Sequence, residues 1–596
     1  MGSGRRYRPD RLLGHGSPLS TDLRRLMKGG FRIEVEMSTN RQAPEQQGPP
    51  TFEISGVRIW TAEPAIAVPP RTVIIGHLFT RGPPSRRVEA FEVGEGDGLA
   101  ANDAQRLLRQ YWGGYVMVHA DPGGAVRIFR DPSGLLPCYV RRDRGRVTLA
   151  GSITDLANPA PGSANLDEIA RILAGGDLRG RRTCVSDVEE LIASECLVID
   201  KGELRTEQYW SPWDHVASSG LGADDMADAL RRTIADCVGA WATCFPSIMV
   251  GVSGGLDSSI VAASAANMAK RLTCLNLVSP DFDGDERRYA RALAESIGTL
   301  LIEEHRELQD IDVTVSAAPH HPWPVAPLYK QTNEAIHRRL LGQLPVDAFF
   351  SGNGGDGILC GVRSAVPFID RLLAEGPRPS LASTLYDLTL LTGADTKTVL
   401  KHGWDRYRRN RGRHSPLINL AGLGKEVGRK IRAEGASHPW LDAPDDILPG
   451  KTVHAAFLMR AQKGIELYPR ATMPPHIAPL MSQPIIEACL AIPTWDWIAG
   501  GQNRAVARKA FEGCLPELIT ARTQKGGPGD FHLSIYRAHR SALHDRLRGG
   551  ILAESGILDL ALLDTPEDPS WRGTDRIDRI LTFVAAENWA RYWEGN

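Results

Sequence analysis

The sequence predicts a mixed fold, in which a β-rich N-terminal region precedes an α/β region with a parallel sheet and a largely helical C-terminal part. Short apolar strands separated by turn residues fill the stretch from about Phe52 to Trp210. From about Asp224 the chain alternates apolar strands with helices, which is the pattern of a parallel sheet, and from about Pro377 onward helical patterns dominate. A chain of 596 residues is too long for a single core, so two or three domains are expected.

Changes in composition set the expected domain boundaries. Residues 1–50 are rich in Gly, Arg, Pro and Gln without sustained periodicity, so we expect a disordered leader or an upstream extension before a later start such as Met37. The β-rich domain covers residues 51–210, and a polar linker with Gly and Ser covers 211–222. The α/β domain with its helical part covers residues 223–596.

The apolar pattern also predicts individual elements. In the first domain we expect strands at 72–79, 115–119, 126–129 and 138–140, with a turn at 131–137. A helix begins near Asp224, because an apolar residue recurs every four positions from Met226 to Val238. In the second domain we expect parallel strands at 248–252, 275–278, 300–303 and 348–351.

A Gly- and Ser-rich turn after the predicted strand at 248–252 carries most of the functional information. Glycines let backbone N–H groups approach a phosphate, and the N-terminus of the following helix adds positive potential. Serine hydroxyls donate further hydrogen bonds, and an aspartate here is placed to hold Mg²⁺ on the same phosphates. No Gly-Lys-Ser/Thr follows, so this is not a Walker A loop but the S-G-G-x-D-S loop of enzymes that split ATP into AMP and pyrophosphate. The predicted ATP-binding residues are Ser253, Gly254, Gly255, Asp257, Ser258 and Ser259.

Two later strand ends complete the predicted nucleotide site, because parallel sheets bind ligands at the carboxyl ends of their strands. Leu277 and Val278 close the next strand and are expected to form the adenine wall. The strand at 348–351 runs into a second Gly-rich turn, where Ser351 and Gly352 are expected to bind ATP. Asp356 in this turn is the expected second Mg²⁺ ligand, facing Asp257 across the phosphates.

Composition excludes several other classes of protein. The net charge of −1 argues against nucleic acid as the main partner. The nine cysteines form no C-x-x-C pair and no regular framework, which favours reduced thiols. The N-terminus lacks the apolar core of a signal peptide, and no apolar run approaches the ~20 residues of a membrane span. We therefore expect a cytoplasmic enzyme with no membrane partner.

Longer segments resemble the asparagine-synthetase-like ligases, from about residue 70 to the C-terminus. Residues 113–137 resemble the N-terminal Ntn-type glutamine-amidotransferase β-sandwich of that family, and residues 477–493 resemble its C-terminal helical region. Residues 522–527 resemble its late active-site loop, in which Lys525 is the lysine that reaches the active site. The resemblance implies a sandwich followed by a pyrophosphate-loop synthetase domain, similar to the adenine nucleotide alpha hydrolases, that uses ATP and Mg²⁺.

Two departures from the family pattern narrow the implied activity. Glutamine-hydrolysing members carry a cysteine at the mature N-terminus, whereas the first cysteine here is Cys138. The sandwich is therefore expected to be inactive, and the nucleophile to be an amine of the substrate itself. Asparagine and β-lactam synthetases also place glutamate or tyrosine three residues before the second aspartate, where this chain has Asn353, which cannot act as a general base.

Further segments resemble one subgroup, the lasso peptide cyclases, which are macrolactam synthetases of ribosomal peptide biosynthesis. These segments are residues 351–356, 492–495 and 500–511. The resemblance implies adenylation of an Asp or Glu side chain in a precursor core peptide, followed by attack of its N-terminal amine. An α-amino group has a pKa of ~7.7–8.0, so this amine needs no strong base, which agrees with Asn353 at the catalytic position. Lys525 would stabilise charge on pyrophosphate and at the tetrahedral centre.

The subgroup also implies two partner proteins, a leader peptidase and a leader-binding protein that act before the cyclase. Two alternatives to a cyclase stay open on the sequence. One is a small-molecule amide or β-lactam synthetase, and the other is a non-catalytic scaffold that binds a peptide. The presence of both aspartates and Lys525 argues against the scaffold.

Overall fold

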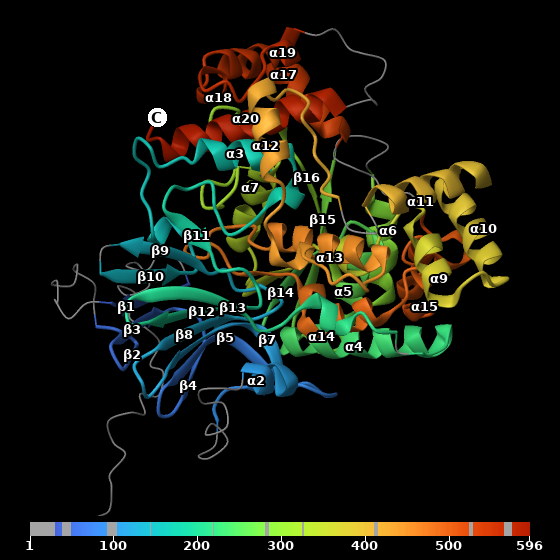
Figure 1. Cartoon of the computed structure of the whole chain (residues 1–596), viewed down its shortest axis with the longest axis horizontal. Helices are drawn as coiled ribbons and strands as arrows, with labels where there is room; N and C mark the ends of the chain where they lie inside the picture. The colour runs from blue at the N-terminus through green and yellow to red at the C-terminus, as the bar shows by residue number, and fades with distance from the viewer. Residues whose placement is uncertain are drawn as a thin grey trace, which may run out of the picture.

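The computed structural model describes residues 30–37, 49–91, 104–143, 145–218, 220–279, 285–324, 327–410, 415–523, 529–564 and 575–596. Its N-terminal part stacks two antiparallel sheets, and the rest of the chain builds a parallel sheet with helices around it (Figure 1). The predicted fold class is therefore confirmed. In the view of Figure 1 the sandwich lies at the lower left and the last helices lie at the top.

The sandwich consists of one six-stranded sheet and one seven-stranded sheet. The six-stranded sheet has the order β11-β9-β10-β1-β3-β2, and the other has the order β13-β12-β8-β7-β5-β4 with β6 beside β5. The strands are β1 Phe31–Glu36, β2 Phe52–Ile54, β3 Val57–Thr61, β4 Ala65–Val68, β5 Thr72–Thr80, β6 Arg87–Val88, β7 Tyr111–Ala120, β8 Val126–Arg130, β9 Tyr139–Asp143, β10 Arg146–Ala150, β11 Val188–Glu190, β12 Glu195–Asp200 and β13 Glu203–Gln208. Two helices accompany them, α2 Ala104–Gln110 and α3 Leu166–Ala174.

The expectation that residues 1–50 lie outside the fold is wrong for β1. This strand pairs with β10 on one side and with β3 on the other, so it lies in the middle of the six-stranded sheet. Phe31, Ile33 and Val35 alternate into the core between the sheets. The alternating pattern has only three apolar residues and lies in a polar stretch, so the composition of residues 1–50 did not reveal the strand. A start at Met37 would remove this strand.

The seven-stranded sheet is buried on both faces. On β5, Val73 and Ile75 belong to the core between the two sheets, whereas Ile74 and Leu78 belong to a second core that continues into the α/β domain. Successive side chains of a strand point to opposite faces, so a doubly buried strand reads as a continuous apolar run. Two helices of the α/β domain, α4 Ala223–Thr243 and α14 Gln483–Ala491, share this second core. The two domains are therefore joined by apolar packing.

The α/β domain is built on five parallel strands in the order β16-β15-β14-β17-β18. They are β14 Ile248–Gly251, β15 Leu272–Val278, β16 Leu300–His305, β17 Ala348–Phe350 and β18 His476–Ile477. The four predicted strands are confirmed, with shifts of up to three residues at their ends. The fifth strand, β18, was not predicted, because a strand of two residues is too short to show a periodic apolar pattern. Helices α5 Leu256–Ala266, α6 Arg287–Ser296 and α7 Lys330–Leu341 follow β14, β15 and β16.

The rest of the chain is helical, as predicted. A lobe of three helices, α9 Val366–Glu375, α10 Ser380–Thr392 and α11 Thr396–Asn410, lies at the right of Figure 1. The other helices are α8 Gly355–Ile358, α12 Lys425–Glu434, α13 Pro449–Ala461, α15 Ala505–Ala510, α16 Glu517–Thr520, α17 Gly529–Arg548, α18 Ile551–Glu554, α19 Ala561–Asp564 and α20 Asp575–Trp593. Within the described residues, no helix is long and apolar enough to cross a membrane.

Charged pairs reinforce the contact between the two domains. Arg81, the residue that follows β5, donates two hydrogen bonds to Glu487 of α14, at 2.8 and 2.9 Å. Arg470 donates to Glu63 at 2.9 Å and to the Leu135 carbonyl at 3.2 Å. Part of the linker expected at 211–222 takes part as well, because its short 3₁₀ turn Pro212–His215 places His215 near Glu487. The sandwich and the parallel sheet are thus held in one fixed arrangement.

Candidate active site

The candidate site lies at the carboxyl ends of the parallel strands, where β14 runs into α5. Gly255 is the N-cap of α5 and makes no side-chain cap, so the first N–H groups of the helix stay available to an anion. Ser258 and Ser259 both turn their hydroxyls toward the Gly255 carbonyl, at 3.2 and 2.8 Å. The backbone N–H of Ser253 donates to the Ser258 hydroxyl at 3.3 Å. The predicted phosphate loop therefore forms a compact turn over a helix N-terminus.

Glycine is required at two contacts of this loop. Gly254 has a φ of 60°, in the left-handed region, and a Cβ added there would lie 2.1 Å from the Tyr289 Cβ. Gly352 of the second loop lies directly on the first, because a Cβ added there would be 2.5 Å from the Ser258 nitrogen. Without side chains at these positions, the two loops touch backbone to backbone. This contact brings the second loop within reach of α5.

The two predicted metal ligands face each other across one arginine. The Nη1 atom of Arg504 lies 2.7 Å from both carboxylate oxygens of Asp257 and 2.6 Å from the Asp356 Oδ1. Asp257 is only 5% exposed, whereas the Asp356 side chain is 66% exposed. The structure therefore brings Asp257 and Asp356 together, with a single positive nitrogen between them.

Sequence reasoning did not single out Arg504 as a site residue. It is the N-cap of α15 and has a φ of 58°, which is uncommon for a residue other than glycine. Its Nε atom is buried and makes no hydrogen bond in the described part of the chain. Backbone strain of this kind costs roughly 1–3 kcal/mol and persists where the surroundings hold it, often at functional sites. The only sequence signal was its place in the segment 500–511, which resembles the lasso cyclases.

The pair of carboxylates fits Mg²⁺ on chemical grounds. Mg²⁺ is usually bound through one or two carboxylates together with substrate phosphates, rather than by a complete protein cage. No group of three or more His, Cys, Asp or Glu side chains suited to a metal occurs in the residues that the structure describes. Asp257 and Asp356 would therefore hold the ion only in the presence of a phosphate ligand, and Arg504 balances their charge in its absence.

The predicted adenine wall at the end of β15 carries an arginine that the sequence did not indicate. Arg306 donates from Nη1 to the Leu277 carbonyl at 3.2 Å, and its backbone N–H donates to the Val278 carbonyl at 3.0 Å. It also donates to the Ser279 hydroxyl at 2.7 Å and to the Asn333 Oδ1 at 2.9 Å. Burial lowers the pKa of Arg306. The predicted residues Leu277 and Val278 thus lie at a strand end rigidly fixed by this side chain.

The second Gly-rich loop, which follows β17, contains the predicted residues Ser351 and Asn353. Ser351 follows β17, and its hydroxyl accepts the backbone N–H of Asn353 at 3.1 Å. Asn353 is exposed, and Ser351 is half-buried. The predicted catalytic residue Lys525 lies outside the described residues, so its position stays a prediction. Its neighbour Arg522 donates to the Ser253 carbonyl at 3.2 Å and to Glu286 at 2.8 Å, which ties this part of the chain to the phosphate loop.

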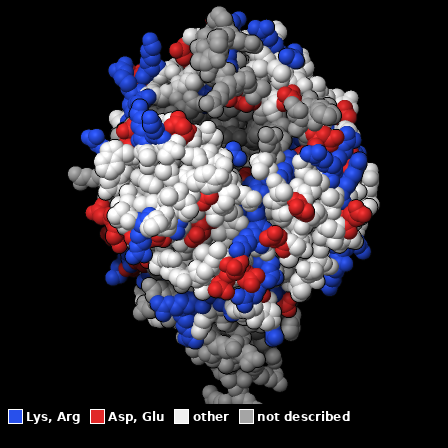
Figure 2. Space-filling model, turned by 90° about the vertical axis from the view of Figure 1, so that its right-hand side faces the viewer, with Lys and Arg blue, Asp and Glu red and all other residues white. Residues whose placement is uncertain are grey.

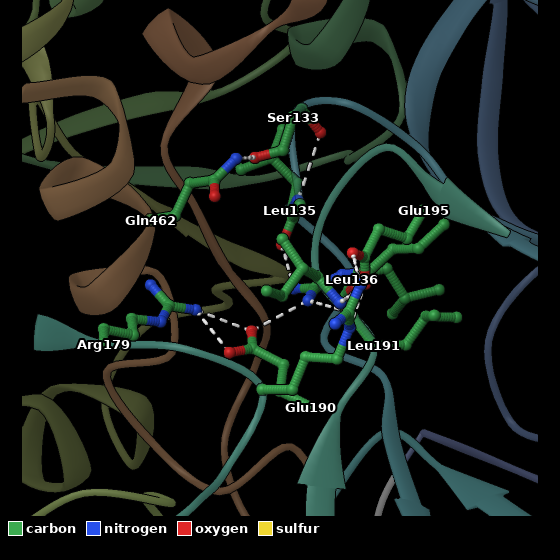
Figure 3. A network of polar contacts seen from close by, with 12 residues as sticks. Ser133, Leu135, Leu136, Arg179, Glu190, Leu191, Glu195 and Gln462 are labelled. Carbon is green, nitrogen blue, oxygen red and sulfur yellow. Dashed lines mark hydrogen bonds and ion pairs between the residues drawn. The ribbon is translucent and has the colours of Figure 1, made fainter. Parts of the chain in front are cut away.

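In the sandwich, by contrast, the charged side chains of the segment that resembled an amidotransferase are engaged in internal contacts. Arg130 donates to Glu190 at 2.8 Å, and Arg179 donates to the same carboxylate at 2.6 Å. Burial by itself raises the pKa of Glu190, but the guanidiniums of Arg179 and Arg130 outweigh it and hold the pKa below its ordinary value. Figure 3 shows Arg179 and Glu190 facing each other, with Gln462 of the other domain reaching toward Ser133. These groups make a buried structural clamp.

The cysteines of the described sandwich are not activated thiols. Cys138, Cys184 and Cys196 are all buried. Burial raises the pKa of Cys138 and of Cys196 to about 12, and it raises the pKa of Cys184 well above its ordinary value. Reactive cysteines need the opposite, a partly exposed and electropositive environment. None of these three thiols is suited to nucleophilic attack on glutamine.

The fold and the site together define an α/β protein with a pyrophosphate-type phosphate loop and two facing aspartates. The family model described as asparagine synthase matches residues 229–591, which is more than half of the chain. The chain therefore belongs to the asparagine synthase family, whose members are ATP-dependent ligases that form amide bonds. No curated protein matches the chain.

Two of the solved structures that the chain resembles are distant from it in sequence. One is the glutamine phosphoribosylpyrophosphate amidotransferase from B. subtilis complexed with ADP and GMP, at 9% identity and a TM-score of 0.18, covering 47% of this chain and 76% of that one. The other is described as the allosteric regulatory enzyme of purine biosynthesis, at 10% identity and a TM-score of 0.17, covering 47% of this chain and 75% of that one. At these scores neither likeness bears on the function.

Proposed function

We propose that this chain is an ATP-dependent lasso peptide cyclase. It adenylates an Asp or Glu side chain of a leader-free core peptide and joins it to the N-terminal amine of the same peptide, releasing AMP and pyrophosphate. The observation that carries the adenylation step is the facing pair Asp257 and Asp356 at the N-terminus of α5. The subtype rests on the segments 351–356, 492–495 and 500–511 and on Asn353 in place of a base.

In this proposal the loop after β14 binds the triphosphate, and the second loop contributes Asp356 to the Mg²⁺ site rather than binding phosphate through Ser351 as the sequence predicted. The N–H groups in the first turn of α5 donate to phosphate oxygens. The hydroxyls of Ser258 and Ser259 donate to the Gly255 carbonyl in this structure, so they would rotate to join the Ser253 hydroxyl in donating to the phosphates. Mg²⁺ held by Asp257 and Asp356 would neutralise charge on the phosphates. Arg504, which balances the two aspartates here, then lies beside the departing pyrophosphate, where a guanidinium binds phosphate oxygens well.

The reaction has two steps. A carboxylate oxygen of the peptide attacks the α-phosphorus, and the bond to pyrophosphate breaks, which leaves an acyl-adenylate. The neutral N-terminal amine then attacks the acyl carbon, an amide bond forms, AMP leaves, and the amine gives up one proton. A neutral α-amine is already available near neutral pH, so the exposed Asn353 does not have to act as a base. Holding amine and acyl group together supplies most of the rate enhancement.

Exposed apolar side chains beside the site favour a peptide over a small molecule. On the lobe α9–α11, Tyr386 is 64% exposed and Trp404 is 54% exposed, with further exposed apolar groups at Leu373, Leu390 and Leu400. Exposed apolar groups gathered in one place commonly mark an interaction surface. Leu390 packs against Gly501, three residues before Arg504, so the lobe borders the site. Figure 2 shows this side of the molecule hollowed near its middle, with basic side chains along the hollow.

Several further properties belong to the proposal. The sandwich has no glutaminase activity and serves as a structural support. The chain acts in the cytoplasm after a leader peptidase and a leader-binding protein of the same pathway, and it binds neither nucleic acid nor membrane. The high pKa values of the three sandwich cysteines support the first point.

The experiment is a product analysis with ATP, Mg²⁺ and a leader-free candidate core peptide. We expect AMP, pyrophosphate and a peptide lighter by one water, all abolished by Asp257→Asn. Turnover of a small β-amino acid with no change in the peptide would instead favour the β-lactam-type synthetase. Asparagine formation from ammonia would contradict the cyclase, and an absence of AMP with every substrate would favour the peptide-binding scaffold.

A further inference from the structure

A buried histidine lies against the second Gly-rich loop. His476 is on β18, which pairs in parallel with β17, and it is 3% exposed. Its Nε2 atom lies 2.7 Å from the Ser351 Oγ. Its Nδ1 atom lies 2.6 Å from the Ile465 carbonyl oxygen. Both ring nitrogens therefore have one hydrogen-bond partner each.

These two contacts determine where the protons lie. A carbonyl oxygen can only accept, so the Nδ1 of His476 carries a hydrogen and donates it to Ile465. A neutral imidazole has one N–H, which leaves Nε2 as an acceptor, so the Ser351 hydroxyl must donate to it. The ring is neutral because burial lowers the pKa of His476 to about 4, and nearby His337, Lys330 and Arg470 also lower it.

The Ser351 hydroxyl is thereby left as an acceptor toward any ligand. Its only proton points to His476, and one lone pair accepts the backbone N–H of Asn353. A hydroxyl oxygen has two lone pairs, so one remains. Ser351 is half-buried and Asn353 is exposed, so this side of the loop faces solvent. An oxygen in this state repels carboxylate and phosphate oxygens and binds an N–H group.

The order of the strands indicates which N–H group would donate to the Ser351 oxygen. Neighbouring strands are about 4.8 Å apart, and β14 lies between β15 and β17, so the end of β17 at Ser351 is roughly 10 Å from β15, the strand that carries the adenine wall. The phosphate loop follows β14, between the two. An adenine at β15 and a triphosphate at β14 therefore leave the end of β17 to the second substrate. The N–H donor of that substrate is its amine.

We propose that the Ser351 Oγ is the hydrogen-bond acceptor for the nucleophilic amine, and that His476 is a positioning residue that fixes the Ser351 proton away from it. This inference rests on the proposed amide-forming function and names the atom that receives the amine. A hydrogen bond from the amine to Ser351 turns the nitrogen lone pair toward the acyl carbon. His476 orients the hydroxyl and does not itself take up the proton released by the amine.

Two substitutions of His476 separate positioning from packing. His476→Gln keeps an amide oxygen near the Nε2 position, so it can still accept from Ser351. His476→Asn keeps a donor near the Nδ1 position and loses the acceptor. The matched control is His438→Gln, since His438 is also buried but contacts Trp440 rather than the site. Each variant is measured by peptide-dependent ATP–pyrophosphate exchange and, separately, by formation of the dehydrated peptide.

We expect His476→Asn to slow amide formation about 10- to 100-fold, which corresponds to roughly 1.4–2.8 kcal/mol, because the lost hydrogen bond acts only on the second step. Exchange should change less than about threefold. His476→Gln should recover most of the rate, and His438→Gln should change neither step. Equal losses in the Gln and Asn variants, or a loss in exchange that matches the loss in amide formation, would overturn the proposal.

A measurement on the unliganded protein keeps the inference independent of the proposed function. Nitrogen-15 NMR of the histidine rings should show His476 with its proton on Nδ1, and Ser351→Ala should shift the Nε2 signal. A proton on Nε2 would overturn the placing of the Ser351 hydrogen, whatever the substrate. If the wild-type chain forms no dehydrated peptide at all, the cyclase function fails, while this result still decides the role of His476.

Discussion

The edge of the parallel sheet and the centre of the sandwich both hold charged side chains, but they use them in opposite ways. At the sheet edge, the Asp356 side chain is largely exposed, and it pairs with Arg504, an arginine from another element. In the sandwich, Arg130, Glu190 and Arg179 are all nearly inaccessible and satisfy one another and nearby carbonyls. The first arrangement leaves charge for a ligand to complete, and the second leaves none. The clamp in the sandwich is therefore structural, whereas the pair at the sheet edge is suited to a ligand.

The largest effect on activity is expected from a substitution at the carboxyl edge of the parallel sheet. Asp257→Asn should lower AMP formation about 10³-fold, because a metal ion supplies several kcal/mol of charge stabilisation and each 1.4 kcal/mol is a factor of ten. The folded structure should survive, since Asn keeps the size of the side chain. Steady-state AMP release and circular dichroism measure the two properties. An active Asp257→Asn enzyme would mean that the facing aspartates are structural, like the clamp in the sandwich.

In the sandwich the same kind of change should act on stability alone. Glu190→Gln leaves two buried guanidiniums without their carboxylate and should destabilise the chain by about 3–5 kcal/mol, with little effect on the turnover of the folded fraction. Thermal unfolding checks this, with the exposed neighbour Glu189→Gln as the matched control. A loss of turnover in folded Glu190→Gln protein would show that the sandwich takes part in catalysis.

A third substitution is expected to make the stability of the chain depend on Mg²⁺. Arg504→Ala removes the cation between Asp257 and Asp356, so the two carboxylates repel each other, and we expect a loss of about 1–3 kcal/mol without metal. Mg²⁺ should restore more stability in this variant than in the wild type. Lys509→Ala, which removes an exposed pair with Asp224, is the control. Equal Mg²⁺ responses in both proteins would contradict the placing of the metal.

The smallest expected effect is a pH dependence in the sandwich. Burial raises the pKa of Asp131 to about 6, above its ordinary value. A raised folded-state pKa contributes stability below pH ~4 that is lost as the pH rises through about 6, amounting to roughly 1–3 kcal/mol. Asp131→Asn should flatten this slope, whereas the exposed Asp143→Asn should keep it. Unfolding midpoints measured between about pH 4 and about pH 8 distinguish the two variants, and an unchanged slope in Asp131→Asn would contradict the assignment.

The two regions also differ in what the sequence could predict. Parallel strands and the phosphate loop were predictable, because apolar runs and Gly-Ser turns are local signals. The loop residues Asp257 and Asp356 were placed correctly at neighbouring strand ends. Arg504 and His476 were not predicted, because the site residues that they contact, Asp257 and Ser351, lie more than 100 residues away in sequence and only the folded chain brings them together. β1 was missed because a short strand in a polar segment carries too little periodicity.

The central claim is that the site containing Asp257 and Asp356, at the carboxyl edge of the parallel sheet, adenylates a carboxylate. An isotope-transfer experiment tests this claim most directly. The core peptide is prepared with heavy oxygen in its acceptor Asp or Glu carboxylate and incubated with the chain, ATP and Mg²⁺. Attack of the carboxylate on the α-phosphorus must leave one labelled oxygen in the AMP, so the account predicts AMP with a single heavy oxygen. Unlabelled AMP, or ADP and phosphate in its place, would contradict it.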